Sequence, residues 1–181
     1  MLDLPLVLYA SPTLAGIKSA SLFTCSFPGR QEMLDALLRQ NRILSPKGLH
    51  LLPLYCRYDR VCLYLYRPTL LARDLSHPKA RALLGQLGYP PSCTACLAHL
   101  MKKFRTQVAF PHEIGLFLGY PPGDVFGFMR DPDACLYTGC WKVYENVALA
   151  QALFSQYKKC TQRNREQLSK GIPLDSLIRP S

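Results

Sequence analysis

With 181 residues, of which 49% are hydrophobic and 19% charged, the chain can form one core, is short for two ordinary domains and differs in composition from disordered proteins. The formal net charge of +10 favours anionic partners such as phosphates, nucleic acid or carboxylated small molecules. No segment approaches the ~20 apolar residues of a membrane-spanning helix, and no basic residues precede the apolar run at 4–10, so we expect a single-domain, soluble, cytoplasmic protein that does not bind membranes.

The first half of the sequence predicts strands with one helix between them. After a turn at Ser11 and Pro12, the segment 18–25 is typical of a short strand. Apolar residues then recur at helical spacing from 33 to 38, which predicts a helix that ends before Pro46. The segments 49–56 and 60–67 are rich in leucine and tyrosine and flank a short polar gap. They predict a β-hairpin whose first strand, interrupted by Pro53, lies at an edge.

The second half predicts mostly helices. Three of them are expected at 68–75, at 77–87 and from an N-cap at Ser92 to about Arg105. The segment CLYTGCWKVY at 135–144 alternates in a way typical of a strand, and a long final helix is expected at 145–169.

The segment 110–128, FPHEIGLFLGYPPGDVFGF, predicts two tightly turned helical elements. Pro111 fits the first turn of one element, and Gly119 fits the left-handed residue that ends it. Asp124 fits the N-cap of the next element, which would run to Met129. Together the elements predict an α+β fold, with a small antiparallel sheet, helices packed on it and a long C-terminal helix. The interrupted order of strands argues against a doubly wound nucleotide-binding fold.

Three motifs carry a resemblance to a known family. FPHEIGLFLGYPPGDVFGF followed by GCWKVY, with SPTLAGIKSASLF near the start and FSQYKKCT near the end, resembles the bacterial family catalogued as domain of unknown function 3793. The matching positions are Lys18, Pro111, His112, Glu113, Gly115, Gly119, Tyr120, Asp124, Gly127, Trp141, Lys142 and Tyr144. A departure is Cys140, where the family more often has an aromatic residue. The resemblance covers nearly the whole chain, but it implies no activity, because the family is functionally uncharacterised.

His112 and Glu113 are the candidate catalytic residues. Adjacent side chains diverge by about 100° on a helix, so the two cannot easily act on one proton. A glutamate in the first turn of a helix is also stabilised by the exposed amides, which gives Glu113 a purely structural explanation. An imidazole near a helix N-terminus can accept a proton or ligate a metal, and the alternative for His112 is a hydrogen bond to a neighbouring carbonyl.

The candidate ligand-binding residues combine cations, a carboxylate and aromatic rings. They are Lys18, Tyr120, Asp124, Trp141, Lys142 and Tyr144. If they converge with His112, such a pocket suits a flat anionic ligand, with charge on one side and stacking on the other. Capping alone also explains Asp124, and a solvated surface position explains any single lysine. GYPPGDVFG lacks the pattern of a phosphate-binding loop, and its prolines remove N–H donors.

Eight cysteines, without a signal peptide, are expected to be reduced thiols. Cys93 and Cys96 have C-x-x-C spacing but follow no strand of a thioredoxin-like unit. By count alone, a four-thiolate metal site could combine this pair with Cys135 and Cys140.

Three hypotheses of different class follow. The first is a protein that binds an anionic small molecule or cofactor, with or without a reaction on it, in a cleft around 110–128. The second is a metal- or haem-binding protein that uses His112 and cysteines. The third is a non-catalytic basic adaptor for RNA or an acidic protein, based on the basic residues of 101–105 and of the final helix, although no nucleic-acid-binding motif accompanies them. The sequence specifies no cofactor, reaction or oligomeric state.

Overall fold

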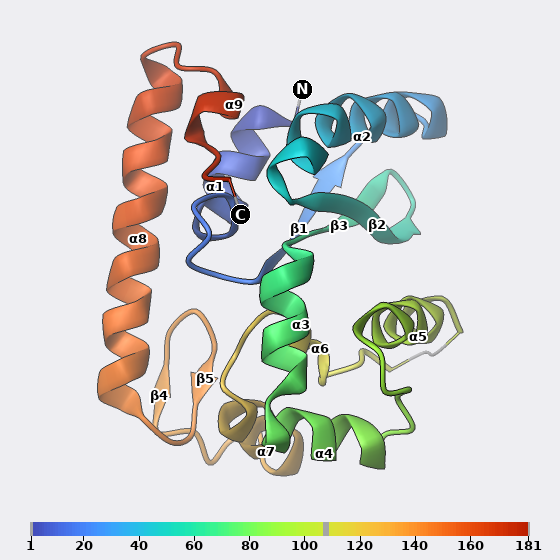
Figure 1. Cartoon of the computed structure of the whole chain (residues 1–181), viewed down its shortest axis with the longest axis vertical. Coiled ribbons are helices and arrows are strands. Elements are labelled where there is room, and N and C mark those ends of the chain that lie inside the picture. The colour runs from blue at the N-terminus through green and yellow to red at the C-terminus, as the bar shows by residue number, and fades with distance from the viewer. Residues whose placement is uncertain (1, 107–108, 181) are drawn as a thin grey trace. The chain divides into compact units, whose positions relative to one another are not determined.

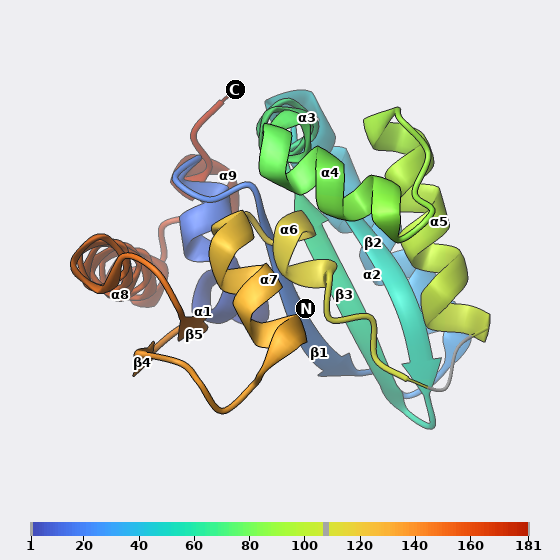
Figure 2. The same cartoon turned by 90° about the horizontal axis from the view of Figure 1, so that it is seen from below.

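The computed structural model describes residues 2–106 and 109–180 and contains two compact units (Figures 1 and 2). The first unit comprises Met1–Leu70 and Lys158–Ser181, and the second comprises Leu71–Tyr157. The α+β fold expected from the sequence is confirmed, whereas the single domain expected from chain length stays a prediction. In the described part of the chain, no helix is both long enough and apolar enough to cross a membrane.

The first unit is built on a three-stranded antiparallel sheet in the order β1-β3-β2. The strands are β1 (Ala20–Ser26), β2 (His50–Arg57) and β3 (Arg60–Tyr66). The predicted hairpin is confirmed, and β2 lies at an edge, as expected for a strand in which Pro53 cannot donate to a ladder. A register shift between Pro53 and Tyr55 marks the same irregular position.

Helices pack on one face of this sheet, and an apolar core lies between them and the strands. They are α1 (Asp3–Leu14), α2 (Arg30–Leu44), a 3-10 turn η1 (Ser45–Lys47) and α9 (Leu174–Leu177). Alternate residues of β3, Val61, Leu63 and Leu65, point into the core, which α1 and α2 also line. The predicted helix after residue 29 is confirmed as α2. The turn predicted at Ser11 and Pro12 is wrong, because both residues lie inside α1, which also contains Pro5 near its start.

Arg67 joins the segments around this core. It is 1% exposed, and its guanidinium donates to the carbonyl oxygens of Thr13 (2.7 Å), Leu14 (2.7 Å) and Arg179 (2.6 Å). Thr13 and Leu14 end α1, so Arg67 satisfies carbonyls that the helix cannot. Gly16, with φ of 73°, turns the chain beside this side chain. The SPTLAGIK motif therefore has a structural purpose: it ends α1 around a buried arginine.

The second unit is mainly helical and confirms most of the predicted helices. Its elements are α4 (Pro78–Gln86), α5 (Cys93–Thr106), α6 (Ile114–Phe117), α7 (Pro122–Arg130), β4 (Tyr137–Thr138) and β5 (Lys142–Val143). Two further helices, α3 (Pro68–Ser76) and α8 (Val147–Ser169), have residues in both units. The predicted N-cap of α5 is confirmed, because the amide of Ala95 donates to Ser92 Oγ at 3.2 Å.

Three predictions for this unit are wrong. Pro111 does not lie in the first turn of a helix, because α6 starts at Ile114, after the N-cap Glu113. The segment 135–144 is not one strand. It contains β4 and β5, two antiparallel strands of two residues each, and the chain turns between them at Gly139. Asp124 is not an N-cap, because α7 starts at Pro122 after Pro121, and Asp124 is its third residue. A capping carboxylate would accept from amides of its own helix, but that of Asp124 accepts from a different segment.

Candidate functional site

Asp124 organises the polar contacts of the 110–145 region. It is 3% exposed, and Oδ2 accepts from the indole Nε1 of Trp141 at 2.7 Å. Oδ1 accepts from the backbone amides of Tyr144 (2.7 Å) and Glu145 (3.1 Å). The carboxylate therefore fixes the segment 141–145 against α7.

Aromatic rings surround this carboxylate. Tyr120 stacks on Trp141 with ring centroids 4.7 Å apart, and Phe154 meets Trp141 edge-on at 4.5 Å. Burial, followed by the nearby thiol of Cys140, raises the pKa of Tyr120 to about 12. Tyr144 donates its hydroxyl to the carbonyl of Asp131 at 3.0 Å. Four predicted ligand-binding residues thus come together and contact one another: Tyr120, Asp124, Trp141 and Tyr144.

The remaining predicted ligand-binding residues are the two lysines. Lys142 Nζ donates to the carbonyl of Pro132 at 2.6 Å, lies 3.7 Å from a carboxylate oxygen of Asp133 and sits over the Phe128 ring. Lys18 lies in the first unit, whereas every other predicted site residue lies in the second. The predicted convergence of Lys18 with His112 and Trp141 stays a prediction.

The candidate catalytic pair diverges, as expected for adjacent residues. His112 is exposed, and its ring lies against Phe128 at a centroid distance of 5.1 Å. Glu113 is 4% exposed and accepts hydrogen bonds from the hydroxyl of Tyr89 (2.8 Å) and from Lys103 Nζ. The ring of His99 lies 4.5 Å from that of Tyr89, which extends the cluster towards α5.

The pKa of Glu113 reflects these partners. Burial alone raises it, but the hydrogen bond from Lys103, a backbone hydrogen bond, the hydrogen bond from Tyr89 and the charge of Lys103 hold the pKa below its ordinary value. Burial and the same carboxylate raise the pKa of Tyr89. The cluster therefore holds an ionised carboxylate, an ammonium and a neutral phenol. This role of Lys103 is not predicted from the sequence, because MKKFR is typical of a solvated basic segment.

The cysteines do not gather into a metal site in the described residues. None of the eight forms a disulfide in the described structure, and residues 2–106 and 109–180 contain no group of three or more His, Cys, Asp or Glu side chains that could hold a metal ion. Cys96 donates its thiol to the carbonyl of Pro90 at 2.9 Å, and burial raises the pKa of both Cys93 and Cys96. The metal- or haem-binding hypothesis thus gains no ligand set from this part of the chain.

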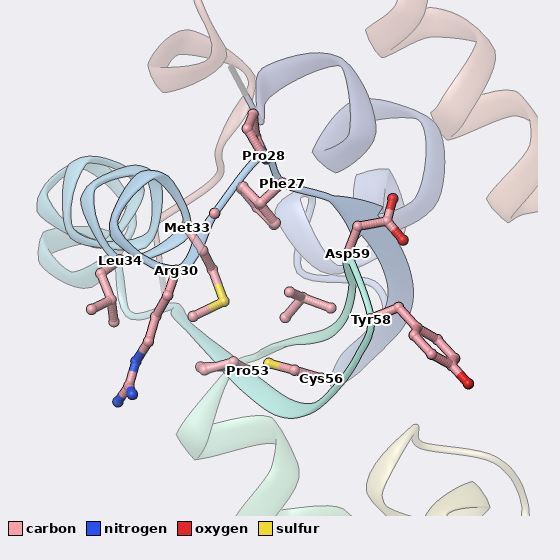
Figure 3. A pocket seen from close by; sticks show the side chains of 11 residues that line it. Phe27, Pro28, Arg30, Met33, Leu34, Pro53, Cys56, Tyr58 and Asp59 are labelled. Atoms are coloured by element: carbon pink, nitrogen blue, oxygen red, sulfur yellow. The ribbon is translucent and has the colours of Figure 1, made fainter.

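A groove of about 650 Å³ lies in the first unit, between the start of α2 and the β2–β3 hairpin (Figure 3). Its lining comes from Phe27, Pro28, Gly29, Arg30, Met33, Leu34, Pro53, Cys56, Tyr58, Asp59 and Val61. Figure 3 shows Phe27, Met33 and Cys56 turned inward, while Arg30 and Tyr58 extend outward. The groove thus combines an apolar interior with a charged rim.

This groove is not predicted from the sequence, because segments that are distant in sequence form it. The turn Phe27-Pro28-Gly29 and the hairpin turn at Tyr58 are its signals, and Tyr58 has a left-handed φ of 54° with its ring fully exposed. A smaller hollow of about 280 Å³ lies between α4 and α7. Pro122, Gly123 and Phe126 of the predicted segment line that hollow, and Lys79 and Glu145 form an ion pair of 3.6 Å on it.

Comparison with known families agrees with the resemblance that the motifs described above carry. The model of the family described as Protein of unknown function (DUF3793) matches residues 6–178. The chain belongs to this family. No curated protein and no solved structure matches it.

Proposed function

We propose that the protein binds a small molecule with an apolar body and an anionic group in the groove of Figure 3. The observation that carries the proposal is a groove of about 650 Å³ with a mostly apolar lining that also includes the cationic residue Arg30. Ligand pockets commonly have volumes of about 300–1,000 Å³ and few polar groups. The proposal keeps the ligand class expected from the sequence and moves the site from 110–128 to 27–61.

The charge of the first unit supports an anionic ligand. Residues 1–70 and 158–181 contain fourteen Lys and Arg against six Asp and Glu, whereas residues 71–157 contain eight against six. The first unit therefore carries +8 of the net +10, and its field attracts anions. Asp59 lies on the same rim, which favours a ligand with a single negative group over one with several.

The contacts of the predicted segment 110–128 support this change of location. Both oxygens of Asp124 accept hydrogen bonds from the protein, and Glu113 accepts from two side chains. A ligand at either carboxylate would replace internal hydrogen bonds, each with a net value of about 1.5–3 kcal/mol for a charged group. A ligand in the groove of the first unit would contact apolar side chains and would replace none of these hydrogen bonds.

The experiment uses 1-anilinonaphthalene-8-sulfonate, whose apolar rings and single sulfonate match the proposed ligand class. We expect saturable fluorescence enhancement and slower alkylation of Cys56 by iodoacetamide when the probe is bound, followed by mass spectrometry of the peptides. Cys140, also exposed but in the second unit, is the internal control and should react at an unchanged rate.

Substitutions sharpen this test. Arg30→Gln should raise the dissociation constant up to about fivefold, because an exposed charge pair is worth up to about 1 kcal/mol. Cys56→Phe should fill the groove and abolish saturable binding, whereas Cys140→Phe should leave it intact. Equal probe binding by Cys56→Phe and the unsubstituted protein, or equal protection of both cysteines, would refute the proposal.

A further inference from the structure

The half of α8 that lies in the first unit, together with Lys170 directly after its last residue, presents a concentrated band of positive charge. The band, which we call the basic band, consists of Lys158, Lys159, Arg163, Arg165 and Lys170. All five side chains are exposed. The opposite face of the helix is anchored to α1, since Asn164 Nδ2 donates to Ser11 Oγ at 3.2 Å and the thiol of Cys160 contacts the Ser11 carbonyl. Figure 1 shows α1 and α9 beside this part of α8. Because Cys160 and Asn164 face α1, helical spacing places the band on the other side of α8.

Helical geometry arranges the band as two rows. At 100° per residue, Lys159, Arg163 and Lys170 fall on one row, and Lys158 and Arg165 on another. Gln162 and Glu166 lie between the rows and bond each other, with Gln162 Nε2 donating to Glu166 Oε1 at 2.6 Å. The one acid within the band therefore neutralises none of its cations by direct contact.

The cations of the band are not explained by the stability of the fold. Within residues 2–106 and 109–180, none of the five side chains makes an ion pair or a hydrogen bond. Basic residues near a helix C-terminus are favoured by the macrodipole, but that effect is confined to the last turn. The last turn of α8 contains no basic residue, and of the five cations Lys170 alone lies next to the end of the helix. The cations from Lys158 to Arg165 thus concentrate positive charge over about 10 Å, and in the described part of the chain they form no ion pair or hydrogen bond that would stabilise the fold.

The residues around the basic band indicate which class of anionic partner it suits. Exposed large hydrophobic residues occur elsewhere in the described chain, and none of them lies between 158 and 180. A membrane surface or a protein interface normally uses apolar and aromatic anchors beside its charges, and single-stranded nucleic acid uses aromatic rings for stacking. A band with charge alone suits a partner that is itself a regular array of charge. Duplex nucleic acid presents one phosphate per about 1.7 Å of axis.

We infer that the basic band binds the phosphate backbone of duplex nucleic acid without reading its sequence. The inference is independent of the groove, whose side chains come from residues 27–61. The cations would neutralise phosphates and release counterions, so affinity falls steeply with salt and is similar for different sequences. Duplex RNA and duplex DNA share this chemistry.

The test measures fluorescence anisotropy of short labelled duplexes, as RNA and as DNA, at salt concentrations between about 50 and 200 mM. The band variant combines Lys159→Gln, Arg163→Gln and Lys170→Gln. On DNA it should lower the slope of log affinity against log salt by about 2.7, because each phosphate contact contributes about 0.9. Its affinity should fall at least tenfold at the low end of the salt range.

The control variant removes three exposed cations of the second unit, through Lys102→Gln, Arg105→Gln and Arg130→Gln. It has the same net charge as the band variant and should bind the duplexes like the unsubstituted protein. Equal losses by both variants, or no loss in the band variant, would overturn the inference. Tighter binding of polyglutamate or anionic lipid vesicles than of either duplex would overturn it too, in favour of another partner. Circular dichroism tests whether each variant is folded. If the groove probe still protects Cys56 in the band variant, a loss of duplex binding is independent of the proposed function of the groove.

Discussion

At the scale of single residues, Glu113 shows how a buried charge is retained in the second unit. Its side chain is 5% exposed and that of its partner Lys103 is 16% exposed, so both charges are largely removed from water. A buried pair of this kind need not add net stability, but removal of one partner leaves an uncompensated charge that costs about 3–5 kcal/mol. Tyr89 adds a third contact and orients the carboxylate.

The first prediction concerns this carboxylate. Glu113→Gln should lower the free energy of unfolding at neutral pH by about 3 kcal/mol, the low end for a broken buried pair, because Lys103 is still partly solvated. Urea unfolding followed by circular dichroism measures the change. Asp133→Asn is the control, because the side chain of Asp133 is 98% exposed and lies 3.7 Å from its lysine, so the expected loss is below about 1 kcal/mol.

The pH dependence of this difference has a definite sign. The folded-state pKa of Glu113 is lowered, so its contribution is fully present above the unfolded pKa of about 4.3 and is lost as pH falls through the folded value. The stability gap between the unsubstituted protein and Glu113→Gln should therefore narrow as pH falls below that of the unfolded carboxyl. A gap that stays constant through this range would show that Glu113 is not held ionised by Lys103 and Tyr89.

At the scale of elements, two glycines of α7 should respond oppositely to the same substitution. A Cβ on Gly127 would overlap the ring and the Cβ of Tyr144, which lie close to the backbone and cannot move aside freely. For a Cβ on Gly123, the nearest atoms would be those of the Glu145 carboxylate, the far end of a side chain that is 55% exposed and can move aside. The helix needs glycine at 127 for packing and not at 123.

The second prediction follows from this contrast. Gly127→Ala should lower the free energy of unfolding by about 1–3 kcal/mol, as expected for overpacking. Gly123→Ala should be neutral or stabilise the protein by up to about 1 kcal/mol, because alanine is the better helix former. Thermal and urea unfolding of the two variants provide the measurement. Equal effects of the two changes would show that Tyr144 does not pack on α7 as described.

The elements that the sequence predicts well are those specified by local signals. Helical periodicity and Pro or Gly boundaries located α2, α4 and α5, and the alternating apolar residues around a polar gap located the β2–β3 hairpin. The β4–β5 hairpin was mistaken for one strand, because Gly139 turns a segment whose alternation continues across it. Asp124 was mistaken for an N-cap, because its actual donors are 17 to 21 residues away in sequence.

The candidate sites were predictable to a smaller extent, for the same physical reason. The motif residues Tyr120, Asp124, Trp141 and Tyr144 do come together, so the sequence indicated a real cluster. The sequence could not show that their polar atoms are used internally, nor that a groove forms where α2 meets the hairpin turn. Such a groove depends on the packing of two distant segments, and no single segment carries its pattern.

At the scale of the whole molecule, the +10 charge is unevenly divided between the units. The first unit holds +8, together with the groove and the basic band, and the second holds +2 and the two buried carboxylates. The composition gives only the sum of these charges. The division connects both proposals, because a small anion and a nucleic-acid backbone would each be drawn to the first unit.

The third prediction uses the eight cysteines as reporters across the chain. Burial raises the pKa of Cys25, Cys62, Cys93, Cys96 and Cys160. Because the thiolate is the nucleophile, these thiols should react slowly with iodoacetamide, whereas the exposed Cys56 and Cys140 should react first. A time course read by mass spectrometry of the peptides gives the order, and the same reaction in guanidinium chloride should equalise the rates.

The order of alkylation also tests whether the C-x-x-C pair, Cys93 and Cys96, is redox-active. A redox-active pair requires one thiol with a lowered pKa, and both Cys93 and Cys96 have theirs raised, Cys93 by burial and then by its neighbour Cys96. The pair should therefore lag behind Cys56 at every pH below the ordinary thiol pKa of about 8.5. Faster alkylation of Cys93 than of Cys56 would contradict the described environment of α5. It would instead identify an activated thiol at the start of that helix.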